Sequence, residues 1–164
     1  MGRKKTNACP FPQANDMEKV IRLVKIPDEK DLQSISKLSS YLGVSDRQVY
    51  YYLSACLFLD ILTPEHNFTP FGLSLRKKGF DEFNATLAKS IIAKPVFGEV
   101  FFARFIHGDT MSIEDISELI SMDFKIESEG LSERRASTVR NWINWIYSLQ
   151  NIMSVTHDTN NKGQ

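Results

Sequence analysis

The amino-acid sequence predicts a mainly α-helical protein, arranged as a tandem winged helix-turn-helix with short β-hairpin wings. Three observations lead to this fold class. Apolar residues recur at helical spacing behind capping signals along most of the 164 residues. A β-hairpin signal follows the third of the predicted helices. The second half then repeats the order of the first (helix, connection, long helix, strand) with little shared sequence, so the repeat is one of architecture.

The first two helices are predicted from the signals at their ends. Asn15 and Glu18 have the spacing of a capping pair, and apolar residues follow at helical spacing until Pro27 ends the helix. A second helix is predicted over residues 33–42. Gly43 follows it directly and supplies the turn to the next helix.

The third helix and the segment after it complete the first module. Ser45 and Gln48 match a capping box, and they open a helix predicted over residues 45–59. Two short β-prone runs, at residues 61–63 and 68–69, flank a break in the pattern and predict a small hairpin. Three helices followed by a hairpin is the element order of a winged helix-turn-helix.

The middle of the chain is predicted to be helical as well. Thr69 as the cap, Pro70 in the first turn and Gly79 after the last turn mark a fourth helix. Residues 80–106 are predicted to form two helices that link the modules, the second of them starting at Pro95.

Phenylalanine is concentrated in residues 68–105, which hold eight of the 11 phenylalanines of the chain. Three of them share one helical stripe at intervals of four residues: Phe97, Phe101 and Phe105. An aromatic stripe with this spacing packs in a core far more often than it lines a ligand site. We therefore expect a deeply packed helix here.

The second half shows the same order of signals. Ser112 caps an amphipathic helix, an irregular and mostly acidic connection follows at 123–130, and Ser132 caps a long helix over residues 132–148. Alternation at 152–156 predicts a final short strand. The predicted domains are a flexible basic arm (1–14), a first winged-helix domain (15–79), linking helices (80–108), a second winged-helix-like domain (109–157) and a disordered tail (158–164).

Charge is unevenly distributed, although the 20 basic and 20 acidic side chains cancel. Residues 1–80 have a balance of +4 and residues 81–164 a balance of −4, so the zero net charge does not exclude a nucleic-acid partner. Two cysteines are too few for a disulfide framework or a four-thiolate zinc site. No apolar segment follows the basic start and no run is long enough to cross a membrane, so we expect a cytoplasmic protein without membrane contact.

The third helix carries the first set of candidate DNA contacts. Its apolar residues share one face, and Arg47 and Tyr51 lie opposite with Gln48 at the edge. Arg can bond guanine and Gln adenine in paired fashion, and a phenol can reach a phosphate. Three consecutive tyrosines, Tyr50–Tyr52, spread around a helix, so at least one phenol faces outward. The alternative is an ordinary solvent-exposed face.

The long helix of the second half separates its two faces more cleanly. Its polar face carries hydrogen-bond donors and no carboxylate, and the candidate contacts on it are Arg134, Ser137, Arg140, Asn141 and Asn144. Five such groups along one helix can read bases or hold phosphates. The alternative is again a solvated surface. Arg135 projects towards the core side and is expected to pair with a local carboxylate such as Glu133.

Three stretches of this sequence resemble a known module. They are Phe11-Pro-Gln13, Asp46-Arg-Gln-Val-Tyr-Tyr-Tyr-Leu-Ser-Ala-Cys56 and Glu133-Arg-Arg-Ala-Ser-Thr-Val-Arg-Asn-Trp-Ile-Asn-Trp-Ile146. Together they are similar to a paired winged-helix module of uncharacterised type, found attached to or beside type II restriction endonucleases. The resemblance covers about residues 11–147 and implies double-stranded DNA binding in a restriction or defence setting. We expect this chain to stand without an attached nuclease, so any cleavage would come from a partner.

The sequence contains little that indicates a catalytic site. The segment 27–30 and the pair Asp123 and Lys125 superficially match short nuclease motifs, but neither lies on a predicted strand. The three histidines are scattered in turns and tails, and there is no glycine-rich phosphate loop. We therefore predict that the protein is not an enzyme, with no catalytic residue, no cofactor and no metal site.

The leading functional hypothesis is binding of duplex DNA, in a recognition or accessory role beside a nuclease or another protein. A protein-interaction module is the alternative from a different class, favoured by the low basicity and by the acidic stretch 114–129. A transcriptional regulator is the third hypothesis, and it would be a homodimer formed through the phenylalanine-rich middle helices.

Overall fold

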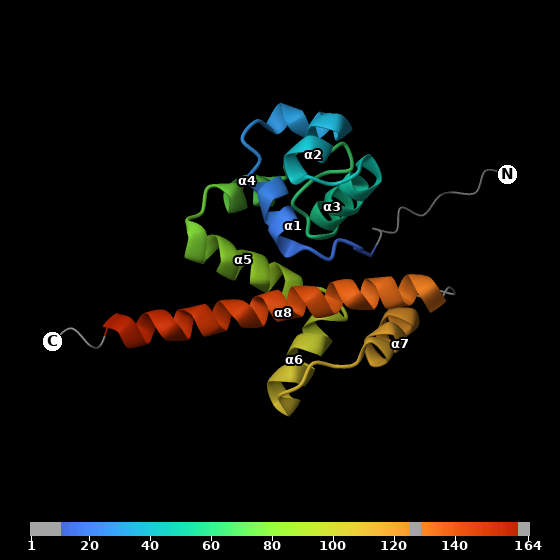
Figure 1. Cartoon of the computed structure of the whole chain (residues 1–164), viewed down its shortest axis with the longest axis vertical. Coiled ribbons are helices and arrows are strands. Elements are labelled where there is room, and N and C mark those ends of the chain that lie inside the picture. The colour runs from blue at the N-terminus through green and yellow to red at the C-terminus, as the bar shows by residue number, and fades with distance from the viewer. Residues whose placement is uncertain (1–10, 125–128, 161–164) are drawn as a thin grey trace. The chain divides into compact units, whose positions relative to one another are not determined.

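The computed structural model of the protein is mainly α-helical, as the sequence predicts (Figure 1). It describes residues 11–124 and 129–160, the side chains at 129–131 and 150–160 excepted. Most of the predicted basic arm therefore lies outside the described residues. The helices are α1 (Met17–Val24), η1 (Glu29–Gln33), α2 (Ile35–Leu42), α3 (Asp46–Phe58), α4 (Pro70–Arg76), α5 (Phe80–Ile92), α6 (Phe97–His107), α7 (Ile113–Phe124) and α8 (Glu129–Asn160).

The chain divides into two compact units. The first unit holds the segment that ends at Ala14 together with residues 19–74. The second unit holds residues 15–18 and the chain from Leu75 onward. Both α1 and α4 contribute residues to each unit, so the division falls inside helices.

Apolar side chains from α1 to α3 and from the segments between them build the core of the first unit. Phe11, in the stretch before α1, packs its ring against that of Phe58 of α3 with 5.6 Å between centroids. The fully buried side chains of this core include Leu23, Ile26, Leu32, Leu38, Leu42 and Leu59. Burial of one face of α3 fixes which of its residues are turned outward.

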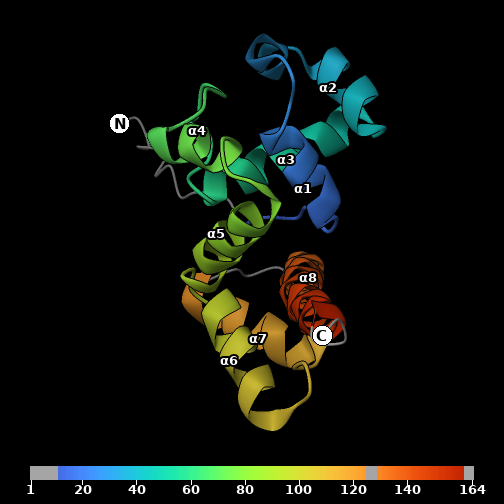
Figure 2. The ribbon, with the colours of Figure 1, turned by 90° about the vertical axis from the view of Figure 1, so that its left-hand side faces the viewer.

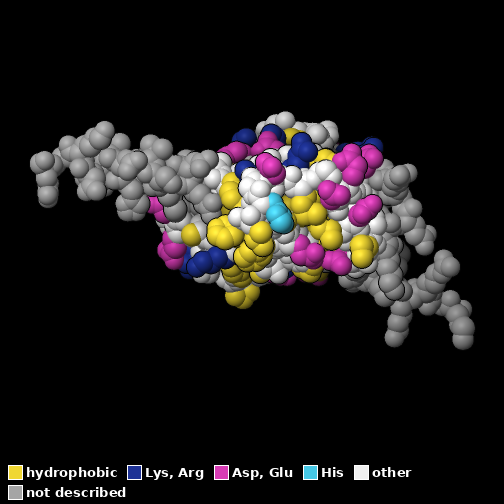
Figure 3. Space-filling view, turned by 90° about the horizontal axis from the view of Figure 1, so that it is seen from below, with side chains coloured by type: hydrophobic (Ala, Val, Ile, Leu, Met, Phe, Trp, Pro, Cys, Tyr) yellow, Lys and Arg dark blue, Asp and Glu magenta, His cyan; other side chains and the backbone are white. Residues whose placement is uncertain are grey.

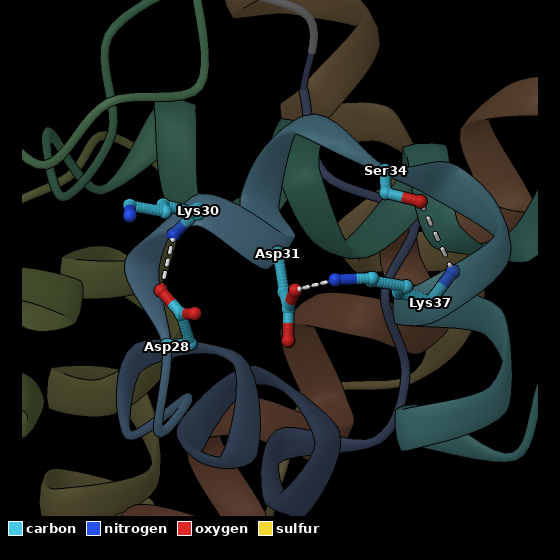
Figure 4. Close-up of polar contacts among 5 residues, drawn as sticks. All are labelled: Asp28, Lys30, Asp31, Ser34 and Lys37. Carbon is cyan, nitrogen blue, oxygen red and sulfur yellow. Dashed lines mark hydrogen bonds and ion pairs between the residues drawn. The ribbon is translucent and has the colours of Figure 1, made fainter.

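Short-range polar contacts fix the segment between α1 and α2 (Figure 4). The Asp28 carboxylate caps η1 by accepting a hydrogen bond from the backbone N–H of Lys30 at 3.0 Å. Ser34 caps α2 in the same way, accepting from the N–H of Lys37 at 3.4 Å. The Lys37 ammonium also pairs with Asp31 at 2.5 Å, and this contact raises the pKa of Lys37. The nuclease-like segment 27–30 is thus a cap and a helical turn, in which Asp28 serves local structure.

A three-residue turn joins α2 to α3, and the two helices contact each other directly. Gly43 adopts φ 66°, a left-handed conformation that glycine tolerates without steric cost, and its N–H donates to the carbonyl of Ser39 at 2.9 Å. The capping box that the sequence predicts is formed. The Ser45 hydroxyl accepts from the N–H of Gln48 at 3.4 Å, and the Gln48 side chain accepts from the N–H of Ser45 at 3.1 Å.

The predicted β-hairpin after α3 is not formed as a pair of strands. A backbone hydrogen bond of 3.0 Å from Thr69 to Ile61 closes a turn, and a single antiparallel bridge links Leu62 to Phe68. No β-strand occurs within residues 11–124 and 129–160. A two-stranded ribbon on its own is marginally stable. Ile61 and Leu62 bury their side chains in the core of the first unit instead.

The second unit consists of α5 to α8 with residues 15–18. α7 packs along α8, and α5 and α6 contact α8 as well (Figures 1 and 2). Trp142 of α8 is fully buried, with its ring 5.2 Å from that of Phe97 of α6. The Thr138 hydroxyl donates to the side-chain oxygen of Asn15 at 2.7 Å, which ties the segment 15–18 to α8.

The predicted strand at residues 152–156 is wrong, because these residues continue α8 to Asn160. A strand needs a neighbour with which to pair its backbone, whereas each residue added to a helix gains a hydrogen bond within the same segment. The described part of the second unit therefore contains helices and no wing. The tail predicted at 158–164 falls partly on α8 and partly outside the described residues.

The phenylalanine stripe of α6 is packed at its start and exposed at its end. Phe97 is fully buried and Phe101 is half-buried, but Phe105 is 73% exposed. The expectation of a deeply packed stripe is therefore wrong for its last member. The buried residues of α6, Phe97 and Val100, both belong to the start of this helix.

The length of α8 alone does not make it a membrane span. It has 32 residues, but charged side chains such as Arg134 and Arg140 interrupt its sequence. In the part of the chain that the structure describes, no helix is both long and apolar enough to cross a bilayer.

Candidate nucleic-acid interface

The outer face of α3 presents a cation and two phenols. Val49, Leu53 and Cys56 of this helix are buried. Arg47 is exposed, and the three consecutive tyrosines separate as helical geometry requires: Tyr50 is 53% exposed, Tyr51 is half-buried and Tyr52 is buried. The structure therefore brings Arg47 and Tyr51 to one outward surface, as the sequence predicts. Tyr50 is a further member of this surface that was not among the candidates from the sequence, although the tyrosine triplet indicated an outward phenol.

Gln48 has a structural role at the start of α3 in addition to its exposed position. Its side-chain oxygen accepts hydrogen bonds from both the N–H and the hydroxyl of Ser45, each at 3.1 Å. The amide NH₂ group of Gln48 is not used by the capping box. Gln48 can therefore donate to a base or a phosphate while it still caps the helix, but its acceptor is occupied.

Two cations of the first unit are engaged in local contacts away from α3. Arg22 donates a hydrogen bond to the backbone carbonyl of Tyr41, and its guanidinium lies over the Tyr41 ring at 4.9 Å from the centroid. Lys37 pairs with Asp31. Arg47 lies beside Asp46, which is exposed in the first turn of α3, where a carboxylate complements the helix dipole.

The polar face of α8 carries two exposed arginines. Arg134 and Arg140 are both exposed, six residues apart along one helix. Ser137 lies between them, half-buried, and its hydroxyl donates to the carbonyl of Glu133 at 3.1 Å. The two guanidinium groups are therefore the parts of this face best suited to reach a phosphate.

Further along α8, Asn141 and Asn144 are exposed but lie in an acidic setting. They line a hollow of about 590 Å³ together with residues 15–18, which include Asp16 and Glu18. The sequence predicted a face without carboxylates. The structure brings these two carboxylates to it from a segment more than a hundred residues away, and they disfavour an approaching phosphate.

Asn144 is also held by a neighbour within the second unit. Its side-chain oxygen accepts a hydrogen bond from Arg104 of α6 at 2.6 Å. The same guanidinium lies over the Tyr147 ring, 4.1 Å from its centroid. Burial raises the pKa of Tyr147, and the nearby Arg104 acts in the opposite direction. Arg104 was not a candidate from the sequence, because only the folded chain brings α6 to this part of α8.

Arg135 lies on the inner side of α8, as its helical position predicts, but it does not pair with Glu133. Its side chain is half-buried, and its Nε is buried with no hydrogen-bond partner within the described residues. Burial lowers the pKa of this arginine. Glu133 is exposed to solvent instead.

A candidate metal or nuclease centre does not form in the described ranges. No group of three or more His, Cys, Asp or Glu side chains there could hold a metal ion. Asp28 is committed to a cap and Asp31 to an ion pair. Lys125, the partner of Asp123 in the second short motif, lies outside the described residues.

The second unit also exposes large apolar side chains on α6. Phe102, Phe105 and Ile106 are 55%, 73% and 72% exposed. Their spacing of three and four residues places them on one side of the helix. Figure 3 shows a face on which hydrophobic side chains gather beside a histidine, with both acidic and basic side chains around them.

Comparison with curated proteins and with solved structures gives no match. A family described as “Domain of unknown function (DUF7226)” matches residues 19–151. This range holds most of the chain, including α3 and the polar face of α8. The chain therefore belongs to the family of this domain of unknown function, DUF7226.

Proposed function

We propose that this protein binds double-stranded DNA through α3. The observation that carries the proposal is the arrangement of α2, the turn Gly43–Ser45 and α3, with Arg47, Tyr50 and Tyr51 on the outward face of α3. Two helices joined by a short turn with a glycine are typical of a helix-turn-helix. In that motif the N-terminal residues of the second helix contact base edges in the major groove. These three side chains belong to the first two turns of α3.

Each side chain has a distinct part in this proposal. Arg47 can donate two hydrogen bonds to a guanine. Gln48 donates through its free NH₂ group, and the hydroxyl of Tyr51 reaches a phosphate. The turn between Leu62 and Phe68 takes the place of the wing in the winged helix-turn-helix that the sequence resemblance implies.

The polar face of α8 contributes a second set of contacts. Arg134 and Arg140 are exposed cations and hold phosphates. Ser137, Asn141 and Asn144 add hydrogen bonds at the edge of this contact. Because Asp16 and Glu18 lie beside Asn141 and Asn144, we assign most of the binding on α8 to the two arginines.

The test compares two variants that each remove one exposed positive charge from the first unit. Arg47→Ala should weaken binding to a labelled duplex by at least about tenfold, the cost of losing a bidentate base contact. Lys30→Ala, in η1, should change the affinity by less than about twofold. Fluorescence anisotropy at low salt measures both. Equal effects of the two variants, or no binding by the unmodified chain, would overturn the proposal.

We place this binding in the cytoplasm, in an accessory role to a nuclease of a restriction or defence system. The support for this setting is the resemblance of residues 11–13, 46–56 and 133–146 to the module found beside restriction endonucleases. Affinity purification of the protein from its own cells should recover a nuclease together with it. Recovery of the protein without any nuclease would contradict this setting and leave duplex binding as a separate result.

A second candidate function is self-association through α6. The observation that favours it is the exposed set of Phe102, Phe105 and Ile106 on one side of this helix. Exposed apolar side chains at helical spacing form a self-complementary surface when two copies meet about a twofold axis. In this second candidate function, the protein is a homodimer that acts as a protein-interaction module or as a regulator.

Light scattering coupled to size-exclusion chromatography tests the homodimer. The unmodified chain should have the mass of a dimer at a concentration of tens of micromolar, and Phe105→Asp should be monomeric. Phe80→Asp is the matched control, because Phe80 of α5 is 74% exposed on another helix. A monomeric unmodified chain, or loss of the dimer in the control alone, would rule out the α6 interface.

A further inference from the structure

A cavity of about 190 Å³, open to solvent on one side, lies between α5, α6 and α8 of the second unit. Its lining is almost entirely apolar, from Ala85, Ala88, Ile92, Phe101, Ile146 and Leu149. The space exists because two positions on the facing side of α5 are alanine. Larger side chains at Ala85 and Ala88 would fill it, as they do in a close-packed interior.

One nearly buried polar side chain lies in this apolar wall. Asn84 of α5 is 5% exposed and lines the cavity. Its amide has two donors and an acceptor, and the described residues provide no hydrogen bond to it. Neither amide atom is fully buried, so a polar group that enters the cavity can form a hydrogen bond with Asn84 in an otherwise apolar lining. Asp81 and Lys89 also line the cavity but are exposed, and their charges remain in water.

Size and polarity of the cavity define the class of ligand. Its volume is somewhat larger than the roughly 150 Å³ of an apolar cavity that takes up benzene, so a single ring with a small substituent fits. A charged group would be costly against the apolar lining. The single amide favours one hydroxyl, carbonyl or amide group on the ligand.

We propose that this cavity is a binding site for a small neutral ring compound that carries one hydrogen-bonding group. The ring occupies the space beside Ala85 and Ala88, and its polar group bonds to the Asn84 side chain. The site uses α5, α6 and α8 and does not rest on DNA binding by α3, so either proposal can fail alone.

Phenol and toluene are the probes, because they have nearly the same shape and differ by a hydroxyl. The full chain, labelled with ¹³C at its alanine methyl groups, is titrated with each probe. Phenol should shift the Ala85 and Ala88 methyl signals in a saturable way and leave Ala93 and Ala103, which do not line the cavity, unchanged. Shifts that do not saturate, or that are equal at all four alanines, would overturn the proposal.

Two variants test separately how the ring and its polar group contribute to binding. Asn84→Leu should weaken phenol binding about five- to tenfold, the loss of one hydrogen bond, and should leave toluene binding unchanged or tighter. Ala85→Phe should abolish binding of both probes, because Ala85 is exposed at the edge of the cavity and its replacement fills the space. Ala93→Phe is the matched control and should bind phenol as the unmodified chain does.

Circular dichroism establishes which variants are folded. If Ala85→Phe is folded and binds phenol with unchanged affinity, the cavity is not the site. If it is unfolded, the methyl titration of the unmodified chain decides the question by itself.

Discussion

The thiol of Cys56 is placed where it cannot react in the folded protein. Cys56 lies on the inner face of α3 with no exposed surface, and burial raises the pKa of its thiol from 9.0 to about 12. Because the thiolate is the reactive form, iodoacetamide at pH 8 should leave Cys56 unlabelled in the native protein and label it in denaturant. Peptide mass spectrometry measures this at Cys56 specifically, and rapid labelling of the native protein would contradict the burial.

The same shift in the pKa of Cys56 has a defined effect on stability. A raised pKa in the folded state means that the neutral thiol is preferred there. The stabilisation is therefore fully present below pH 9 and is lost as the pH rises from 9 towards 12. The free energy of unfolding should fall over this range by more in the unmodified chain than in Cys56→Ala.

Gly72 of α4 lies against the backbone and has no space for a side chain. A Cβ atom there would overlap the carbonyl oxygen of Ile61 and lie 3.0 Å from a ring carbon of Phe68. Gly72→Ala should therefore destabilise the first unit by about 1–3 kcal/mol, the usual cost of overpacking. Gly79→Ala is the control, because a Cβ at Gly79 meets nothing within 4 Å. Thermal unfolding of both variants measures the difference, and equal melting temperatures would show that α4 can shift.

At the scale of the element, α8 depends on one large side chain. Trp142 is fully buried against Phe97, whereas Trp145 on the same helix is only half-buried. Trp142→Ala should cost about 3–5 kcal/mol and unfold the second unit under mild denaturant. Trp145→Ala should cost clearly less. Urea titration followed by circular dichroism compares the two, and a folded, stable Trp142→Ala protein would mean that the faces of α8 are assigned in reverse.

Helices were predictable from this sequence because their signals are local. Ser45 with Gln48, Gly43 and Ser112 each fix a helix end through atoms within a few residues, and each makes the predicted contact. Strands were not predictable in the same way. The alternating residues 152–156 fit a strand by pattern, but pairing depends on a neighbour that the chain does not bring there. The predicted hairpin after α3 is reduced to one bridge, because a two-stranded ribbon on its own is marginally stable.

In the candidate interface, too, the contacts between residues far apart in the sequence were not predictable. Helical periodicity alone placed Arg47 and Tyr51 of α3 outward, and it separated the buried Trp142 from the exposed Arg140 of α8. It could not place Asp16 and Glu18 beside Asn141 and Asn144, nor Arg104 on Asn144, because these contacts join distant parts of the sequence. The cavity beside Asn84 was not predictable either, because residues of three helices line it.

At the scale of the whole molecule, the charge balance limits the kind of DNA binding that we propose. Residues 19–74 contain six basic and six acidic side chains, and the formal net charge of the whole chain is zero. Such a protein lacks the broad positive field that drives binding to any duplex. Binding should therefore depend on a few localised contacts, some to phosphates and some to bases.

These two kinds of contact are distinguishable by salt and by sequence. Replacing Arg134 and Arg140 by alanine should weaken binding uniformly across duplexes, and it should reduce the slope of log affinity against log salt by about 2, since each phosphate contact contributes about 0.9. Arg47→Ala should instead reduce the preference among duplex sequences and change the slope by less than 1. An unchanged affinity of the double variant at low salt would exclude the face of α8 and leave α3 as the whole interface. The reverse pattern, with Arg47 controlling the slope and the α8 arginines the sequence preference, would mean that α8 enters the groove and α3 holds the phosphates.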